Sequence, residues 1–145
     1  MKLESILLGF FQSIILFLSP IQGLLIAVGA AIMADTFFGV RLALKEKTYK
    51  TKILRKGLIN KMLLYQLAVI TFFIIDYNAL NAWLVNDVGI DYLLTKLLST
   101  VLIFVEMSSI NETSSKLYKQ SFYKTFLDII KKLKDFRKHL KDEFK

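Results

Sequence analysis

Four apolar blocks separated by short polar segments constrain the fold of this chain more than any other feature. The blocks cover about residues 3–19, 21–44, 62–84 and 92–110. A helix needs roughly 20 apolar residues, at ~1.5 Å each, to cross the hydrocarbon core of a bilayer. The second and third blocks reach this length, the fourth is marginal and the first is short. None of them alternates polar and apolar residues, which disfavours a transmembrane β-barrel.

The blocks predict an all-α membrane protein with three to four transmembrane helices. Hydrophobic residues make up 54% of the 145 residues, more than a soluble domain of this size carries. If the first block crosses the membrane, there are four spans and the N-terminus is cytoplasmic, which Lys2 favours. If it lies in the interface, there are three. We expect a transmembrane domain over residues 1–112 and a separate tail over residues 113–145.

The distribution of charge predicts the orientation of the spans. Residues 45–61 contain seven Lys and Arg and one Glu, whereas residues 85–91 contain two Asp and no Lys or Arg. Lys and Arg in short loops stay on the cytoplasmic side of a membrane. We therefore expect residues 45–61 and the C-terminus in the cytoplasm, and residues 85–91 outside it.

The tail has the pattern of a basic amphipathic helix. Its apolar residues recur at spacings of three and four, and residues 116–145 carry ten Lys and Arg against four Asp and Glu. Such helices lie on anionic membrane surfaces or pair along their apolar seam. Nucleic acid is disfavoured as a partner, because the aromatic residues lie on the apolar stripe and not among the basic residues. The candidates for contact with an anionic lipid surface or a partner are Lys131, Lys132, Lys134, Arg137 and Lys138.

Small residues gather on one face of the second block. At ~100° per residue, Gly23, Ala27 and Ala31 fall within one narrow arc, and Gly39 is a further packing candidate on this block. Lipid supplies no hydrophobic force between helices, so close backbone approach along small residues favours association. This face serves packing within one subunit or packing between subunits of a homo-oligomer, and the sequence leaves both open.

Three acidic residues, Asp35, Asp76 and Glu106, lie inside the apolar blocks. An ionised carboxylate in hydrocarbon costs a few kcal/mol, so it normally faces a bundle interior, water or a partner. Asp35 and Glu106 both fall in the inner half of their spans, where Arg41 or Lys61 would serve them as a shared partner. Ion pairing and the lining of a polar path through an assembly both remain open as roles.

The end of the fourth block is densely polar. Ser109 and Asn111 follow Glu106 within two turns of helix. Their side chains can hydrogen-bond across helices or cap the end of the span. We include both residues among the candidates for assembly.

The sequence offers no catalytic constellation. It contains no cysteine and a single histidine, His139, on the polar side of the tail. Thiol catalysis and disulfides are thereby excluded, and one histidine makes no metal site. No Gly-rich phosphate loop and no Ser-His-Asp arrangement occurs. We expect a protein that is not an enzyme and that uses no cofactor or metal.

Three short motifs follow one another between about residues 25 and 115. The first is an Asp with Gly four residues later, over residues 35–39. The second is a basic stretch with Gly, over residues 51–61, and the third is Glu-Met-Ser-Ser-Ile-Asn-Glu over residues 106–112. In order and spacing this resembles the phage holin family that also includes toxin-secretion holins of clostridia. The third motif departs from the family pattern because its Asn-Glu reverses the usual order, and the basic tail lies outside the matching motifs.

The resemblance implies a function that the bare residues do not. A holin accumulates in the inner membrane of an infected bacterium and assembles at a set time into lesions that release or activate a cell-wall hydrolase. It implies a homo-oligomer, a multi-pass protein of the bacterial inner membrane and lysis of the host cell. Two other functions stay open, namely a structural membrane subunit that scaffolds a larger assembly through its tail, and a holin-like exporter of a protein toxin.

Overall fold

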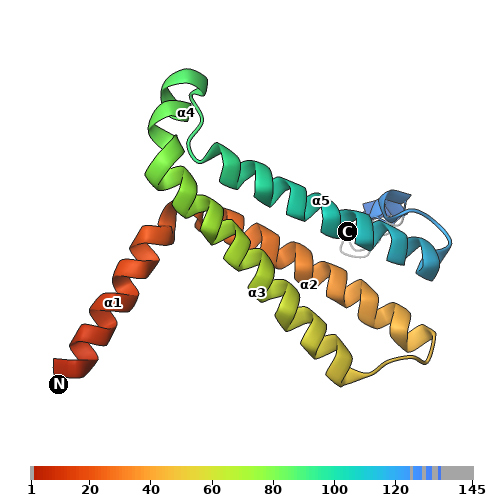
Figure 1. Cartoon of the computed structure of the whole chain (residues 1–145). Helices are drawn as coiled ribbons and strands as arrows, with labels where there is room; N and C mark the ends of the chain where they lie inside the picture. The colour runs from red at the N-terminus through yellow and green to blue at the C-terminus, as the bar shows by residue number, and fades with distance from the viewer. Residues whose placement is uncertain (1, 125, 129, 132–133, 135–145) are drawn as a thin grey trace, which may run out of the picture.

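Every regular element in the described part of the chain is a helix (Figure 1). The computed structural model describes residues 2–124, 126–128, 130–131 and 134. The elements in chain order are α1 (Lys2–Leu18), the 3₁₀ turn η1 (Ser19–Ile21), α2 (Gln22–Lys45), α3 (Thr51–Ile75), the π-helical η2 (Asp76–Leu80), α4 (Asn81–Val88) and α5 (Leu93–Tyr118). The predicted all-α fold is confirmed.

Three helical stretches, Glu4–Lys45, Leu54–Leu80 and Leu93–Tyr118, are long and apolar enough to cross a membrane. The first has 42 residues and runs through α1, η1 and α2. At ~1.5 Å per residue it is about twice as long as the hydrocarbon core is thick. Pro20 in η1 divides it, because proline lacks the backbone donor that continues a helix. The prediction of an all-α membrane protein is therefore confirmed, with three candidate spans among the described residues where the sequence predicted three to four.

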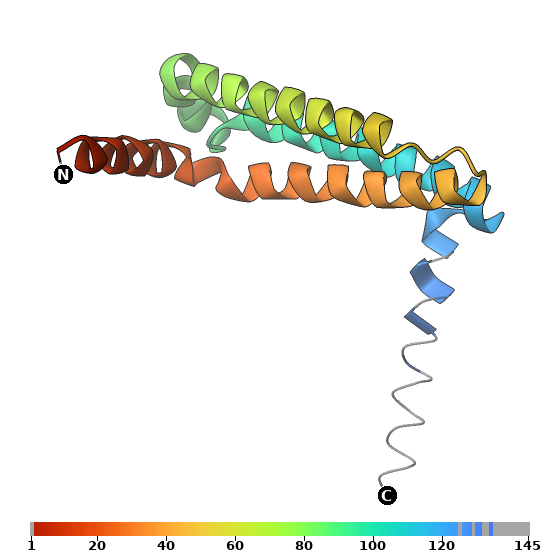
Figure 2. The same ribbon diagram turned by 90° about the horizontal axis from the view of Figure 1, so that it is seen from below.

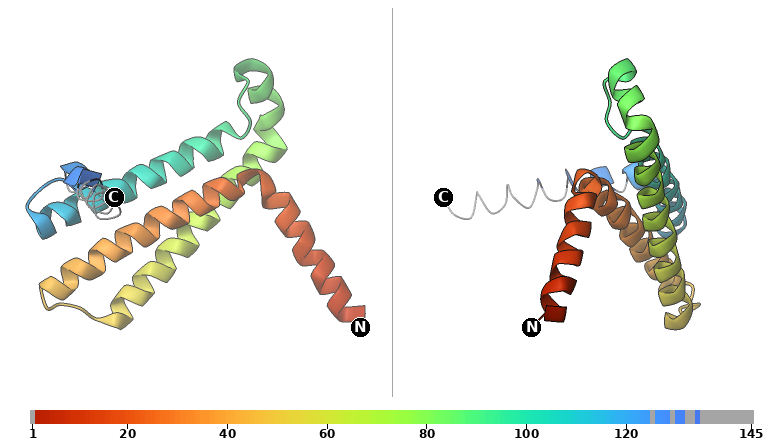
Figure 3. Two further views of the ribbon diagram at one scale, coloured as in Figure 1. Left: turned by 180° about the vertical axis from the view of Figure 1, so that it is seen from behind. Right: turned by 60° about the vertical axis from the view of Figure 1, so that its left-hand side comes forward.

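Helices α2, α3 and α5 pack side by side, and α1 turns away from them at η1 (Figures 1 and 3). The view from below shows the same bundle, with α1 directed away from the end of α2 (Figure 2). The ring of Phe17, near the end of α1, contacts Phe73 and Tyr77 at centroid distances of 5.2 and 5.3 Å. Most other side chains of α1 are exposed. The bundle is thus built from three helices of this chain, with α1 attached at one end.

The surface of the bundle is apolar and much of its interior is polar. A cluster of buried apolar residues joins α2 to α3, with Val28, Ile32, Val69 and Phe73 at its centre. On α5, however, four of the five buried residues are polar, and many large apolar side chains face outward. Water would favour the reverse arrangement, whereas lipid favours polar groups turned inward. The distribution is that of a bundle in a membrane.

The basic segment is mostly helical, where the sequence suggested a loop. Helix α3 begins at Thr51, so only residues 46–50 connect it to α2. Lys52, Arg55 and Lys61 therefore lie within the first three turns of α3. Lys and Arg have high helix propensity, which lets a helix begin among charged residues before its apolar part starts. Helix α4 likewise enters the expected outer loop and ends at Val88, followed by the C-cap Gly89, whose φ of 71° suits a glycine.

Helix α5 continues beyond the fourth apolar block and ends at Tyr118. The predicted amphipathic helix of the tail lies partly outside the described residues. Lys132, Arg137 and Lys138 lie outside them, while Lys131 and Lys134 are exposed. The membrane-surface role of this tail therefore stays a prediction.

Candidate functional site

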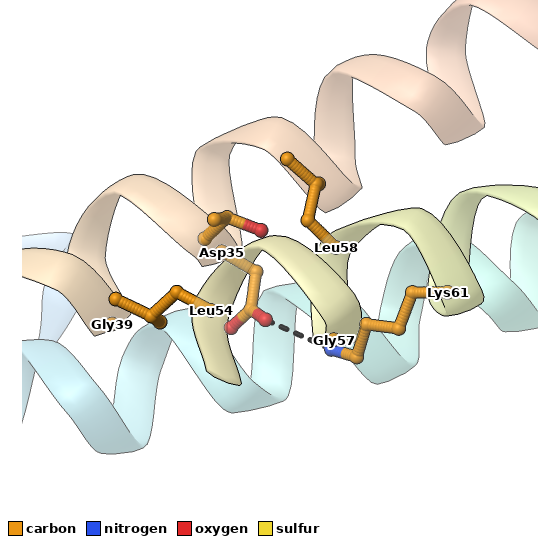
Figure 4. A pocket seen from close by; sticks show the side chains of 7 residues that line it. Asp35, Gly39, Leu54, Gly57, Leu58 and Lys61 are labelled. Atoms are coloured by element: carbon orange, nitrogen blue, oxygen red, sulfur yellow. Dashed lines mark hydrogen bonds and ion pairs between the residues drawn. The ribbon is translucent and has the colours of Figure 1, made fainter. Parts of the chain in front are cut away.

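A charge cluster formed by Asp35, Lys61 and Glu106 joins the three helices of the bundle. Lys61 Nζ, on α3, donates to Asp35 Oδ2 on α2 and to Glu106 Oε2 on α5, each over 2.9 Å. Figure 4 shows the first of these contacts. The Glu106 side chain is only 1% exposed and that of Asp35 14%, while that of Lys61 is 39% exposed. Of the two shared partners that the sequence left open, the structure selects Lys61.

The other candidate partner, Arg41, lies nearer the loop end of α2. Its Nη1 donates to the Tyr118 hydroxyl over 3.2 Å, and its guanidinium stands 4.7 Å from the centre of the Phe37 ring. One turn further on, Lys45 Nζ donates to the carbonyl of Leu117 over 2.7 Å. These two cations tie the end of α2 to the end of α5, so Arg41 is engaged away from the charge cluster.

The charge cluster holds two carboxylates against one ammonium group. Glu106 Oε1 is buried and has no hydrogen-bond partner among the described residues. The hydroxyls of Tyr65 and Ser109 are close enough to interact with the cluster, Ser109 from one turn beyond Glu106 on α5. A buried ion pair does little for net stability, but removing one member leaves an uncompensated charge and is strongly destabilising. Removal of the Lys61 cation would therefore leave both carboxylates without their shared partner at the point where α2, α3 and α5 meet.

Asp76 forms a second buried contact at the other end of the bundle. It lies in η2 and is fully buried. Its Oδ2 accepts from the backbone N–H of Thr95 over 2.7 Å and from the Thr95 hydroxyl over 2.6 Å. The first N–H groups of a helix lack intrahelical acceptors and favour a nearby negative charge. Asp76 thus caps α5 from a distant part of the chain, a contact that its position in the sequence did not indicate.

The predicted small face of α2 is only partly covered by the described part of the chain. Gly23 and Ala27 are exposed and Ala31 is partly buried, whereas Val28 and Gly29 are buried. Packing of this face against a second subunit stays a prediction.

Gly29 is the glycine at which helices approach closely. A Cβ added there would lie 3.3 Å from Gln66 Nε2 and 3.7 Å from Met62 Cε on α3, whereas one added at Gly23 would meet nothing within 4 Å. Sequence reasoning missed Gly29, because its neighbours on that helix face, Leu25 and Ile32, are large and hide it from a search for small residues.

The remaining candidates lie toward the end of the bundle that carries the connection between α2 and α3. Gly39 lines a groove between α2 and α3. Asn111 is exposed, and its Oδ1 accepts from the backbone N–H of Phe122 over 3.0 Å, which ties the start of the tail to α5. Across the part of the chain that the structure describes, no group of three or more His, Cys, Asp or Glu side chains is placed to hold a metal ion.

Comparison with known proteins gives one match. A family model described as the bacteriophage holin family matches residues 12–135, which include α2, α3 and α5 and every member of the charge cluster. Comparisons with curated proteins and with solved structures give no match. The family match and the three apolar helical stretches identify a multi-pass membrane protein. Since the match covers most of its length, the chain belongs to the bacteriophage holin family.

Proposed function

We propose that this protein is a lysis holin, which accumulates in the bacterial inner membrane, oligomerises there and permeabilises it without catalysing a reaction. Its family is one of membrane-permeabilising proteins rather than enzymes. The observation that carries the proposal for this chain is the polar stripe inside the bundle, on the buried face of α5.

The polar stripe consists of Thr95, Ser99, Glu106 and Ser114, all fully buried. Their spacings of four, seven and eight residues keep them on one side of the helix. From the first to the last they extend over about 28 Å at ~1.5 Å per residue, close to the thickness of the hydrocarbon core. Within one subunit the stripe faces inward, with Thr95 bound to Asp76 and Glu106 to Lys61. If the bundle opens on assembly, the stripe would turn toward a lumen between subunits and offer water a polar wall across the membrane. Turned toward lipid, the same groups would be costly.

The open face of α2 supports assembly between copies of the chain. Gly23 and Ala27 are exposed, so a second helix can approach them closely. In the proposed arrangement copies of α2 meet along this face, and the bundle opens on assembly so that the polar stripes of α5 are directed toward the centre of the oligomer.

The proposed topology places the loop between α2 and α3, and the C-terminus, in the cytoplasm. Basic residues at that end would contact the anionic inner leaflet, where each contributes ~1 kcal/mol near the surface. The exposed Lys131 and Lys134 of the tail fit this role. A cell-wall hydrolase would be the functional partner, since permeabilisation of the membrane by itself leaves the wall intact.

We expect Gly23→Leu to weaken assembly without unfolding the subunit. The new side chain enters open space within one chain but blocks close approach of a second helix, so the yield of oligomers should fall about tenfold, as for a loss of ~1.4 kcal/mol. Because the chain has no cysteine, one cysteine introduced beside this face allows disulfide cross-linking in membranes to measure the yield.

Gly29→Leu is the matched control for this experiment. It adds the same side chain on the buried side of α2, where Gln66 and Met62 are close, so it should lower the stability of the subunit itself by ~1–3 kcal/mol. Equal cross-linking of the parent and Gly23→Leu would show that this face is not the interface. A parent that remains monomeric in membranes would contradict the proposed function.

A further inference from the structure

A groove runs between α2 and α3 at the end of the bundle that carries the basic loop. Its volume is ~320 Å³, and it is lined by Gly39, Leu54, Gly57 and Leu58, with Asp35 and Lys61 at the end farther from the loop (Figure 4). We call this site the inner groove. Apart from the charge cluster and Thr36, whose hydroxyl donates to the Ile32 carbonyl, its lining is apolar and includes two glycines.

Nothing in the described chain accounts for these two glycines. Each lies inside a helix, where glycine is less favourable than alanine by roughly 0.5–1 kcal/mol. A Cβ added at Gly39 or Gly57 would meet nothing within 4 Å, in contrast to Gly29, which lies against α3. The missing side chains therefore do not serve helix packing within one subunit. They keep open a space that a molecule outside this chain can fill.

The surroundings of the inner groove are strongly basic. Residues 45–61 carry seven Lys and Arg against Glu46 alone. Among the described residues, the exposed cations Lys50, Lys52 and Arg55 take part in no ion pair. These cations surround the N-terminus of α3, whose N-cap residue Lys50 makes no capping hydrogen bond with its side chain. The first N–H groups of a helix attract anions, and the neighbouring cations add to this attraction.

We propose that the inner groove binds an anionic phospholipid, with one acyl chain between α2 and α3 and its phosphate at the N-terminus of α3. The inference rests on the proposed cytoplasmic location of this loop, because the inner leaflet then supplies the lipid. A second copy of the chain is the weaker occupant, since it would bring an equally basic end to the same level of the membrane. The acyl chain would lie against Leu54 and Leu58 and extend toward the charge cluster.

Lipid retention by the purified full-length protein tests this proposal. The protein is embedded in vesicles of equal parts phosphatidylglycerol and phosphatidylcholine, extracted in mild detergent and analysed by native mass spectrometry. We expect roughly thirtyfold more bound phosphatidylglycerol than phosphatidylcholine, given two basic contacts to the phosphate. Gly57→Leu fills the groove and keeps every charge, and the double variant Lys50→Gln, Lys52→Gln keeps the groove and removes charge. Both Gly57→Leu and the double variant should lose most of the preference for phosphatidylglycerol over phosphatidylcholine.

The matched control is Lys119→Gln with Lys124→Gln, which removes the same charge from exposed positions beyond the groove and should retain the preference. Equal loss in both double variants, with Gly57→Leu unaffected, would show diffuse attraction and overturn the proposal. Unchanged lipid retention in Gly57→Leu with loss of cross-linked oligomers would assign the groove to a second copy and also overturn it. Retention is measured without lysis, so a failure of this inference is distinguishable from a failure of the proposed function.

Discussion

Lys61→Met should destabilise the packed bundle by about 3 kcal/mol. The substitution leaves the carboxylates of Asp35 and Glu106 without their shared cation, and removal of one member of a buried ion pair costs ~3–5 kcal/mol. The lower end of that range applies because Lys61 is 39% exposed and its charge is partly solvated. The free energy of unfolding of the purified protein, measured by titration of mixed micelles with SDS, checks this value.

Two further variants separate the role of charge from that of side-chain volume. Lys61→Arg keeps a cation and should lose less stability than Lys61→Met. The triple variant Asp35→Asn, Lys61→Met, Glu106→Gln removes all three charges, and it should recover much of the loss because no charge is left unpaired. If the triple variant is as unstable as Lys61→Met alone, the charge balance of the cluster does not hold the bundle together.

Asp76→Ala should cost a similar amount, about 3 kcal/mol, at the opposite end of the bundle. It removes the acceptor of two hydrogen bonds to a charged group, each worth ~1.5–3 kcal/mol, and leaves the buried N–H of Thr95 without an acceptor. Thr95→Val loses only the hydroxyl contact and should cost less. We expect the loss in the same micelle titration, together with faster hydrogen exchange in the first turn of α5.

Asp87→Ala is the control for this substitution. Asp87 is an exposed acid on α4, only eleven positions after Asp76 in the chain. Its removal should change the free energy of unfolding by no more than ~0.5 kcal/mol. Equal effects of Asp76→Ala and Asp87→Ala would show that the contact with Thr95 does not stabilise the start of α5.

The sequence predicted the helical class and identified Asp35 and Glu106 as acids that could share a cation, because both follow from one rule. An apolar block must be helical in lipid, and a carboxylate inside it must find a partner. The choice between Arg41 and Lys61 was beyond the sequence. It depends on where α3 begins and how it is rotated against α2, and the run of cations at the start of α3 hides that boundary.

The other contacts depend on distant parts of the chain meeting in space. Asp76 reaches Thr95 because the chain passes through η2 and α4 and returns, and no local pattern encodes that return. Gly29 packs closely because Gln66 and Met62 happen to face it from α3. The small face of α2 was visible in the sequence, but small residues alone do not tell whether they face their own subunit or another one.

The most direct test of the proposed holin function is the membrane potential of bacteria during tightly controlled expression of the full chain. A voltage-sensitive dye reports the potential, and fractionation confirms that the protein is inserted in the membrane. We expect a period of normal potential while the protein accumulates, then abrupt depolarisation, with its onset shifted by Asp35→Ala. A potential that stays stable while the inserted protein reaches high levels would contradict membrane permeabilisation as the function of this chain.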